Sequence, residues 1–181
     1  LYNAMIHPLI PAAVRGVAWY QGESNRDDPQ EYAQLLPTLI KAWRQAWHDR
    51  TPAVAAPLPF LIVQLANNGT PSDDPAKPGT WPAVREVQRR VARDLPDTSL
   101  VVTIDIGEAT GIHPLNKQEV GRRLALRALS DVYHQPGTGG GPRFKSARIA
   151  GGEVIVEFDD LGDGLVAADA GLRGFTIAGS D

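Results

Sequence analysis

The sequence predicts an α/β fold, in which a doubly wound parallel sheet carries helices on both faces and a small antiparallel β unit follows. Two observations support this fold class. Short apolar runs alternate with stretches of helical periodicity over the first 135 residues, and the connections between them are short. The composition then changes at a Gly- and Pro-rich segment, after which the pattern is typical of a β-hairpin.

Three short runs of β-branched or apolar residues are the expected strands of the parallel sheet. They cover residues 17–20, 60–65 and 100–105, and each run is bounded by Gly, Pro or Asp. Continuous apolar runs of this length are typical of strands that are buried on both faces. We therefore expect three parallel strands with helices between them.

Helical periodicity follows each of these runs. Residues 32–47 carry apolar side chains at the i, i+3, i+4, i+7 spacing, and Pro37 either kinks this helix or lies in the first turn of a second segment. The second helix is expected to open at Thr80, with a proline in its first turn. The third is expected to begin near Asn116, because Glu119 follows three residues later as in a capping box.

The change in composition also predicts the domain boundaries. We expect residues 1–135 to form the C-terminal portion of an α/β domain and residues 136–142 to form a Gly/Pro linker. Residues 143–181 are expected to form a partial antiparallel β unit. The predicted hairpin in this unit turns at Gly151-Gly152, and residues 175–177 are a further candidate strand.

Composition bounds the class of protein. A chain of 181 residues with 43% hydrophobic residues can bury a core as one domain with a small appendage. The absence of cysteine excludes disulfides and thiolate zinc sites. No apolar run approaches the roughly 20 residues of a membrane span. The first 13 residues lack the basic region of a signal peptide. Because no methionine starts the chain, we expect this sequence to be a fragment of a longer protein.

Charge gives no support for nucleic-acid binding. The net charge is −3, and the basic residues are scattered along the chain. The densest group lies on a predicted helix among valines, which is typical of the solvated face of an amphipathic helix. This group comprises Arg85, Arg89, Arg90 and Arg93.

Polar loops follow all three predicted strands. Since the carboxyl ends of parallel strands meet at one edge of a sheet, residues 21–25, 64–69 and 106–116 are expected to share one rim. His113 lies in the third of these loops, where it is either a general base or a loop histidine bonded to a backbone carbonyl. The other histidines, His7, His48 and His134, lie in surface-like or helix-end contexts.

The loop after the first strand has two interpretations. Gln21 and Asn25 carry amide donors, and Gly22 lets a backbone N–H approach a ligand, as in an oxyanion site. The alternative is a polar turn in which Ser24 or Asn25 caps the next helix. Ser24 does not fit a nucleophile elbow of the G-x-S-x-G type, because Arg26 stands where the second glycine would be. Residues 67–79 form the longest irregular stretch, either a rim loop or a plain surface loop.

Two motifs resemble those of the sialate O-acetylesterase family, the carbohydrate acetylesterase branch of the SGNH hydrolases. The motifs are Trp19-Tyr20-Gln21-Gly22-Glu23-Ser24-Asn25 and the longer run Ile112-His113-Pro114-Leu115-Asn116-Lys117-Gln118-Glu119-Val120-Gly121-Arg122-Arg123-Leu124-Ala125. The resemblance extends over nearly the whole chain. It implies a flavodoxin-like sheet and a serine-type esterase that removes acetyl esters from sugars without a metal or other cofactor.

The same resemblance implies roles for individual residues. His113 is the general base, Gln21 and Gly22 stabilise the oxyanion, and Glu23 and Asn25 shape the loop. The nucleophile belongs to a Gly-Gln-Ser-Asn-type motif that is absent from this chain, so Ser24 is structural. The family's acidic residue before the histidine is replaced here by Thr110 and Gly111. The acidic member is left open among Asp105, Glu108 and Glu23, with a dyad helped by a backbone carbonyl as a further option.

A different class of function competes with the esterase. A carbohydrate-binding or scaffold domain could keep this fold without the nucleophile, whereas a phosphate-binding protein lacks its expected glycine-rich motif. An O-acetylated carbohydrate is the expected partner, and the resemblance alone suggests a periplasmic or extracellular location. The sequence predicts no particular oligomeric state.

Overall fold

The structure, a computed structural model, describes residues 1–50, 57–70, 74, 79–136, 139–166 and 175–177. It divides into two compact units. The first comprises Leu1–Pro71 and Pro78–Gly140, and the second comprises Ser72–Lys77 and Gly141–Asp181.

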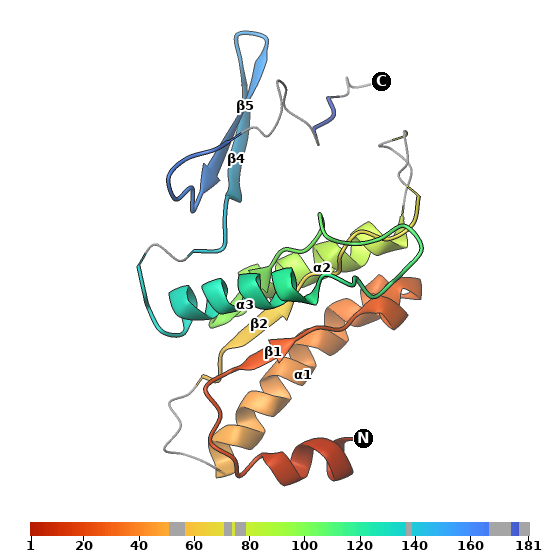
Figure 1. Cartoon of the computed structure of the whole chain (residues 1–181), viewed down its shortest axis with the longest axis vertical. Coiled ribbons are helices and arrows are strands. Elements are labelled where there is room, and N and C mark those ends of the chain that lie inside the picture. Colours follow the sequence, from red (N-terminus) through yellow and green to blue (C-terminus); the bar gives the residue numbers. More distant parts are fainter. Residues whose placement is uncertain (51–56, 71–73, 75–78, 137–138, 167–174, 178–181) are drawn as a thin grey trace. The chain divides into compact units, whose positions relative to one another are not determined.

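A three-stranded parallel sheet forms the centre of the first unit (Figure 1). The strands β1 (Val17–Trp19), β2 (Phe60–Val63) and β3 (Thr98–Val101) lie in the order β1-β2-β3. Val17 is paired with Phe60, and Phe60 is paired with Thr98. The predicted parallel sheet is therefore confirmed.

The third strand begins and ends earlier than predicted. It covers Thr98–Val101 instead of residues 100–105, because the chain turns away from the sheet after Val101. The Thr103 hydroxyl donates to the carbonyl of Gln64, and a turn follows in which the Ile106 amide donates to the Thr103 carbonyl over 3.3 Å. The alternation of valine and isoleucine through this segment resembles a strand, but Ile104 is 45% exposed.

Three helices connect and cover the strands (Figure 1). They are α1 (Pro29–Arg50), α2 (Thr80–Asp94) and α3 (Lys117–Asp131). Pro37 lies inside α1, so no second segment begins there. The predicted cap of α3 is confirmed, since the Asn116 side chain accepts a hydrogen bond from the Glu119 amide over 3.1 Å. Short η1 (Tyr2–Ile6) and η2 (His7–Leu9) helices precede β1.

The core lies on both faces of the sheet. On one face, Phe60 and Ile62 of β2 pack in one cluster with residues of α1 and α2, such as Ile40 and Val84. On the other face, side chains of β2 and β3 pack against α3 in a second cluster. Its buried members are Leu61, Val63, Val101, Val120 and Val132. Alternate side chains of β2 therefore enter opposite layers, which confirms a doubly wound sheet with helices on both faces.

The second unit contains the predicted hairpin. Strands β4 (Arg143–Ala150) and β5 (Glu153–Asp159) are antiparallel and joined at Gly151-Gly152. Both glycines have positive φ angles, +60° and +84°, as the two central residues of a type I′ hairpin turn require. The prediction of a strand at residues 175–177 is wrong, because these residues adopt no strand pairing within the described chain and Ile177 is 82% exposed.

Candidate functional site

The three polar loops meet at the carboxyl edge of the sheet, as the parallel strands predict. The loops after β2 and β3 are joined by a bridge between Asn68 and Glu108 and by a 2.7 Å hydrogen bond from the Gly107 amide to the Asn67 side chain. A Cβ atom on Gly107 would lie 1.9 Å from the Asn67 carbonyl oxygen, so only glycine permits this approach. Residues 71–73 and 75–78 of the predicted rim loop lie outside the described residues.

Gln21 is fixed at the end of β1 by two buried side chains. Its carbonyl oxygen accepts hydrogen bonds from the Tyr32 hydroxyl and from the Gln88 side-chain amide, each over 3.1 Å. Gln88 is fully buried and also accepts a hydrogen bond from the Leu65 amide over 2.9 Å. Gln88 therefore ties the loop after β1 to the loop after β2.

Sequence reasoning did not identify these two supporting residues. A glutamine between Val84 and Val91 on the apolar face of α2 is the signal that could have revealed one of them, because a buried amide requires hydrogen-bond partners. Burial raises the pKa of the Tyr32 hydroxyl; hydrogen bonding with Trp19 and Gln88 partly opposes this rise, and the charge of Glu23 adds a smaller increase. Tyr32 consequently stays neutral and donates to Gln21.

Gly22 occupies a backbone conformation that other residues rarely adopt. Its φ angle is +143°, and the residue is buried. A Cβ atom here would lie 3.3 Å from both Gln88 Nε2 and the Tyr32 hydroxyl oxygen, and 3.4 Å from Val84. The absence of a side chain thus lets the chain pass directly over the groups that hold Gln21.

The loop residues after Gly22 form a short 3₁₀ helix, η3 (Glu23–Asp27). The Gln21 side-chain amide donates to Asn25 Oδ1 over 2.7 Å, while Ser24 is exposed. The interpretation of Ser24 or Asn25 as the cap of the next helix is wrong. Helix α1 begins at Pro29, and the Asp28 carboxylate caps it by accepting from the Glu31 amide over 2.8 Å.

His113 and Glu23 face each other across the rim. The distance from His113 Nδ1 to Glu23 Oε1 is 3.7 Å, longer than a hydrogen bond but close enough for electrostatic attraction when the imidazole is protonated. The His113 side chain is 72% exposed, whereas that of Glu23 is only 17% exposed. The structure therefore brings together the loops that carry the predicted site residues.

The other two candidate acidic residues have different partners. Asp105 forms two short contacts with the Arg123 guanidinium, 2.6 and 2.7 Å, and this arginine lowers the pKa of Asp105. Glu108 accepts a hydrogen bond from the Leu115 amide over 3.2 Å. Among the described residues, Glu23 is the carboxylate paired with His113.

A lysine at the start of α3 contacts the residue that follows β1. Lys117 Nζ lies 4.7 Å from the centre of the Tyr20 ring, a favourable cation–π distance. Burial raises the pKa of the Tyr20 hydroxyl, and the charge of Glu23 adds to this effect. A cation and a polarised aromatic ring thus lie beside the Gln21 end of the rim.

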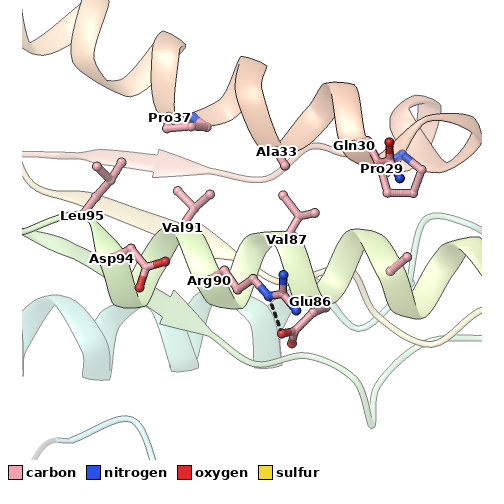
Figure 2. Close-up of a pocket in the computed structure, with 11 residues that line it drawn as sticks. Pro29, Gln30, Ala33, Pro37, Glu86, Val87, Arg90, Val91, Asp94 and Leu95 are labelled. Atoms are coloured by element: carbon pink, nitrogen blue, oxygen red, sulfur yellow. Dashed lines mark hydrogen bonds and ion pairs between the residues drawn. The ribbon is translucent and has the colours of Figure 1, made fainter.

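A groove between α1 and α2 lies apart from these residues (Figure 2). Its volume is about 480 Å³, and none of the predicted site residues lines it. Ala33, Val87 and Val91 form part of its apolar wall. At its edge Glu86 pairs with Arg90 over 2.7 Å, and its arginine partners lower the pKa of Glu86 to about 2. Arg89 and Arg90 of α2 thus share the single carboxylate of Glu86.

The described part of the chain contains no group of three or more His, Cys, Asp or Glu side chains able to hold a metal ion. No helix within the described ranges has the length and apolar character needed to cross a membrane.

The fold is that of an α/β protein whose polar loops gather at the carboxyl ends of its parallel strands, the place where ligands bind in open α/β sheets. The family model for carbohydrate esterase, sialic acid-specific acetylesterase, matches residues 1–130, and the chain belongs to this family. It is 36% identical to mouse sialate O-acetylesterase and 34% identical to the human protein, over 141 residues in each case.

The extent of these similarities differs between the chains compared. The alignments cover 74% of this chain but only 26% of the mouse and 27% of the human protein, so the chain spans about a quarter of their length. The crystal structure of a carbohydrate acetylesterase from Xanthomonas citri is similar, with a TM-score of 0.73 and 42% sequence identity. That similarity covers 87% of this chain and 35% of the neighbour.

Proposed function

We propose that this chain supplies the histidine and the oxyanion rim of a carbohydrate O-acetylesterase that acts by a serine mechanism. The substrate is an O-acetylated sugar. The observation that carries the proposal is the pairing of His113 with Glu23 beside the fixed Gln21–Gly22 segment. Membership of the carbohydrate esterase family supports the same reaction class.

In the proposed reaction, a serine hydroxyl attacks the acetyl carbonyl carbon while His113 Nε2 accepts the serine proton. The tetrahedral intermediate then collapses, the bond to the sugar oxygen breaks, and His113 returns the proton to the departing sugar hydroxyl. Water next attacks the acetyl-serine with His113 again as base. Acetate leaves and the serine is restored.

Glu23 is the proposed acidic partner of His113. Its carboxylate faces Nδ1, the ring nitrogen that is not used in proton transfer, and its negative charge favours the imidazolium that forms during the reaction. The limited exposure of Glu23, 17%, reduces the screening of this attraction by water. We expect the contact of 3.7 Å to shorten when the ring carries a positive charge.

Gln21 and Gly22 are the proposed oxyanion donors. A primary amide carries two hydrogens, and in the described structure Asn25 takes one of those on Gln21. The other hydrogen and the Gly22 amide are then available to the developing oxyanion. Rigid support of Gln21 by Tyr32 and Gln88 favours this role, because oxyanion donors act without rearrangement during the reaction.

The proposed nucleophile lies outside residues 1–181. Ser24 is exposed in a 3₁₀ turn, and among the described residues no hydrogen bond joins it to His113. Its neighbours also fail to form the sharp elbow that presents a nucleophile in other hydrolases. Ser24 therefore serves the shape of the rim.

Replacement of His113 in the complete protein tests the proposal. The variant His113→Ala is expected to lower kcat for p-nitrophenyl acetate by about 100-fold or more, the usual contribution of a general base. His48→Ala is the matched control, because His48 is exposed in the last turn of α1, and its kcat should match wild type. Retention of more than about one-tenth of wild-type activity by His113→Ala contradicts the proposal.

A further inference from the structure

The loop that carries His113 has little support from packing of the histidine itself. The His113 side chain is 72% exposed, and its contact with Glu23 is longer than a hydrogen bond. The position of the imidazole therefore depends on the backbone of residues 109–114. Within the segment Pro114 is buried, and hydrogen bonds are found at the two ends of the segment.

Both ends of the segment are anchored, and Glu108 takes part in each anchor. At the start, the Glu108 backbone forms the bridge with Asn68, whose side-chain amide lies 3.4 Å from the Glu108 carbonyl oxygen. At the end, Glu108 Oε1 accepts the Leu115 amide over 3.2 Å. Pro114 is fully buried between these contacts and His113. The hydrogen bond between the Glu108 side chain and the Leu115 amide thus joins the two ends of the loop.

The carboxylate of Glu108 lies on the inner side of this loop. A Cβ atom added to Gly111 would come within 3.5 Å of Glu108 Oε2, so the carboxylate also borders the middle of the loop. Glu108 is half-buried and is not paired with His113 in the described structure. Its contacts are to the backbone of the loop and not to the imidazole.

We infer that Glu108 is a positioning residue for the proposed general base: its carboxylate, bonded to the Leu115 amide, closes the loop that holds His113 toward Glu23. This inference rests on the proposed role of His113. A misplacement of a reacting group by about 1 Å can reduce the rate about 100-fold, so loss of this closure affects kcat while leaving substrate binding intact.

Two conservative variants separate positioning from charge. Glu108→Gln loses the negative charge but keeps the length of the side chain and an oxygen at its end. This oxygen can still accept a hydrogen bond from the Leu115 amide. Glu108→Asp keeps the charge but is shorter by one methylene group and no longer reaches the amide. Positioning predicts kcat within about threefold of wild type for Glu108→Gln and a loss of about 10-fold or more for Glu108→Asp and Glu108→Ala, with KM unchanged.

The measurement is kcat and KM for p-nitrophenyl acetate in the complete protein, with thermal unfolding as a check of folding. Glu153→Ala, an exposed glutamate at the start of β5, is the control and should match wild type. An active Glu108→Asp with an inactive Glu108→Gln would overturn the inference in favour of a charge effect. Wild-type kcat in Glu108→Asp and Glu108→Ala would overturn it outright. Should Glu108→Ala fail to fold, the Gln and Asp variants decide the question.

Failure of this inference differs from failure of the proposed function. If His113→Ala is inactive and the Glu108→Asp and Glu108→Ala variants keep wild-type kcat, His113 remains the base and another contact fixes its loop. If His113→Ala is active, the proposed function itself fails.

Discussion

Gly22 is the residue whose replacement tests the architecture of the rim most severely. The substitution Gly22→Ala adds one methyl group at a buried position with φ +143°, where an L-residue is strained. The new Cβ would lie 3.3 Å from Gln88 Nε2 and from the Tyr32 hydroxyl oxygen. Both of these atoms hold the carbonyl of Gln21.

The expected cost has two parts. A residue held in a sparsely populated backbone region costs about 1–3 kcal/mol, and an extra methyl group in a well-packed site costs about 1–3 kcal/mol. We therefore expect Gly22→Ala to lower the free energy of unfolding by about 2–6 kcal/mol. Displacement of Gln21 also moves a proposed oxyanion donor from its place, so kcat should fall about 100-fold in the folded fraction.

Gly121→Ala is a matched control for this substitution. Gly121 lies exposed in α3, and a Cβ atom there meets nothing within 4 Å. The same methyl group should therefore stabilise the protein by about 0.5–1 kcal/mol, because alanine is the better helix former. Chemical unfolding and ester hydrolysis of the complete protein measure both effects. A Gly22→Ala variant as stable and as active as wild type would refute the reasoning.

Two further predictions concern charge. Glu23→Gln removes the negative charge facing His113 but keeps the side chain's size; kcat should fall at least about 10-fold with KM little changed, and unchanged kcat would exclude Glu23 as the acidic partner. Arg123 lowers the pKa of Asp105, and together with Arg122 it lowers that of Glu119 to about 2. A carboxylate whose pKa is lower in the folded than in the unfolded protein stabilises the folded state at any pH above its unfolded-state pKa, which is about 4. This stabilisation is lost as the pH falls through the folded-state pKa. Arg123→Met should therefore unfold more easily than wild type at pH 7, by about 1 kcal/mol for the solvent-screened Asp105 pair, and the difference should narrow as the pH falls below about 4; a constant difference across that range contradicts this explanation.

Local patterns in the sequence were sufficient to predict most of the fold. The apolar run at residues 60–65 predicted β2, which covers Phe60–Val63, and the Asn116–Glu119 pattern predicted the start of α3. Both signals act over a few residues and depend little on tertiary structure. The end of β3 was placed wrongly, because the turn after Val101 depends on a contact between Thr103 and Gln64, far apart in sequence.

The candidate site could be predicted only in part, for the same reason. The motifs indicated His113 and the Gln21–Asn25 loop, and the order of the strands indicated a common rim. The pairing of Glu23 with His113, in preference to Asp105, depends on how two distant loops approach each other. The support of Gln21 by Gln88 likewise joins residues 67 positions apart, which no local pattern reveals.

Covalent labelling of the nucleophile tests the central claim most directly. The complete protein and its His113→Ala variant would be treated with a fluorophosphonate, and the modified serine identified by peptide mass spectrometry. The account predicts one labelled serine outside residues 1–181 in the wild-type protein and strongly reduced labelling in His113→Ala, because the serine then lacks its base. Labelling of Ser24, or equal labelling of both proteins, would contradict it.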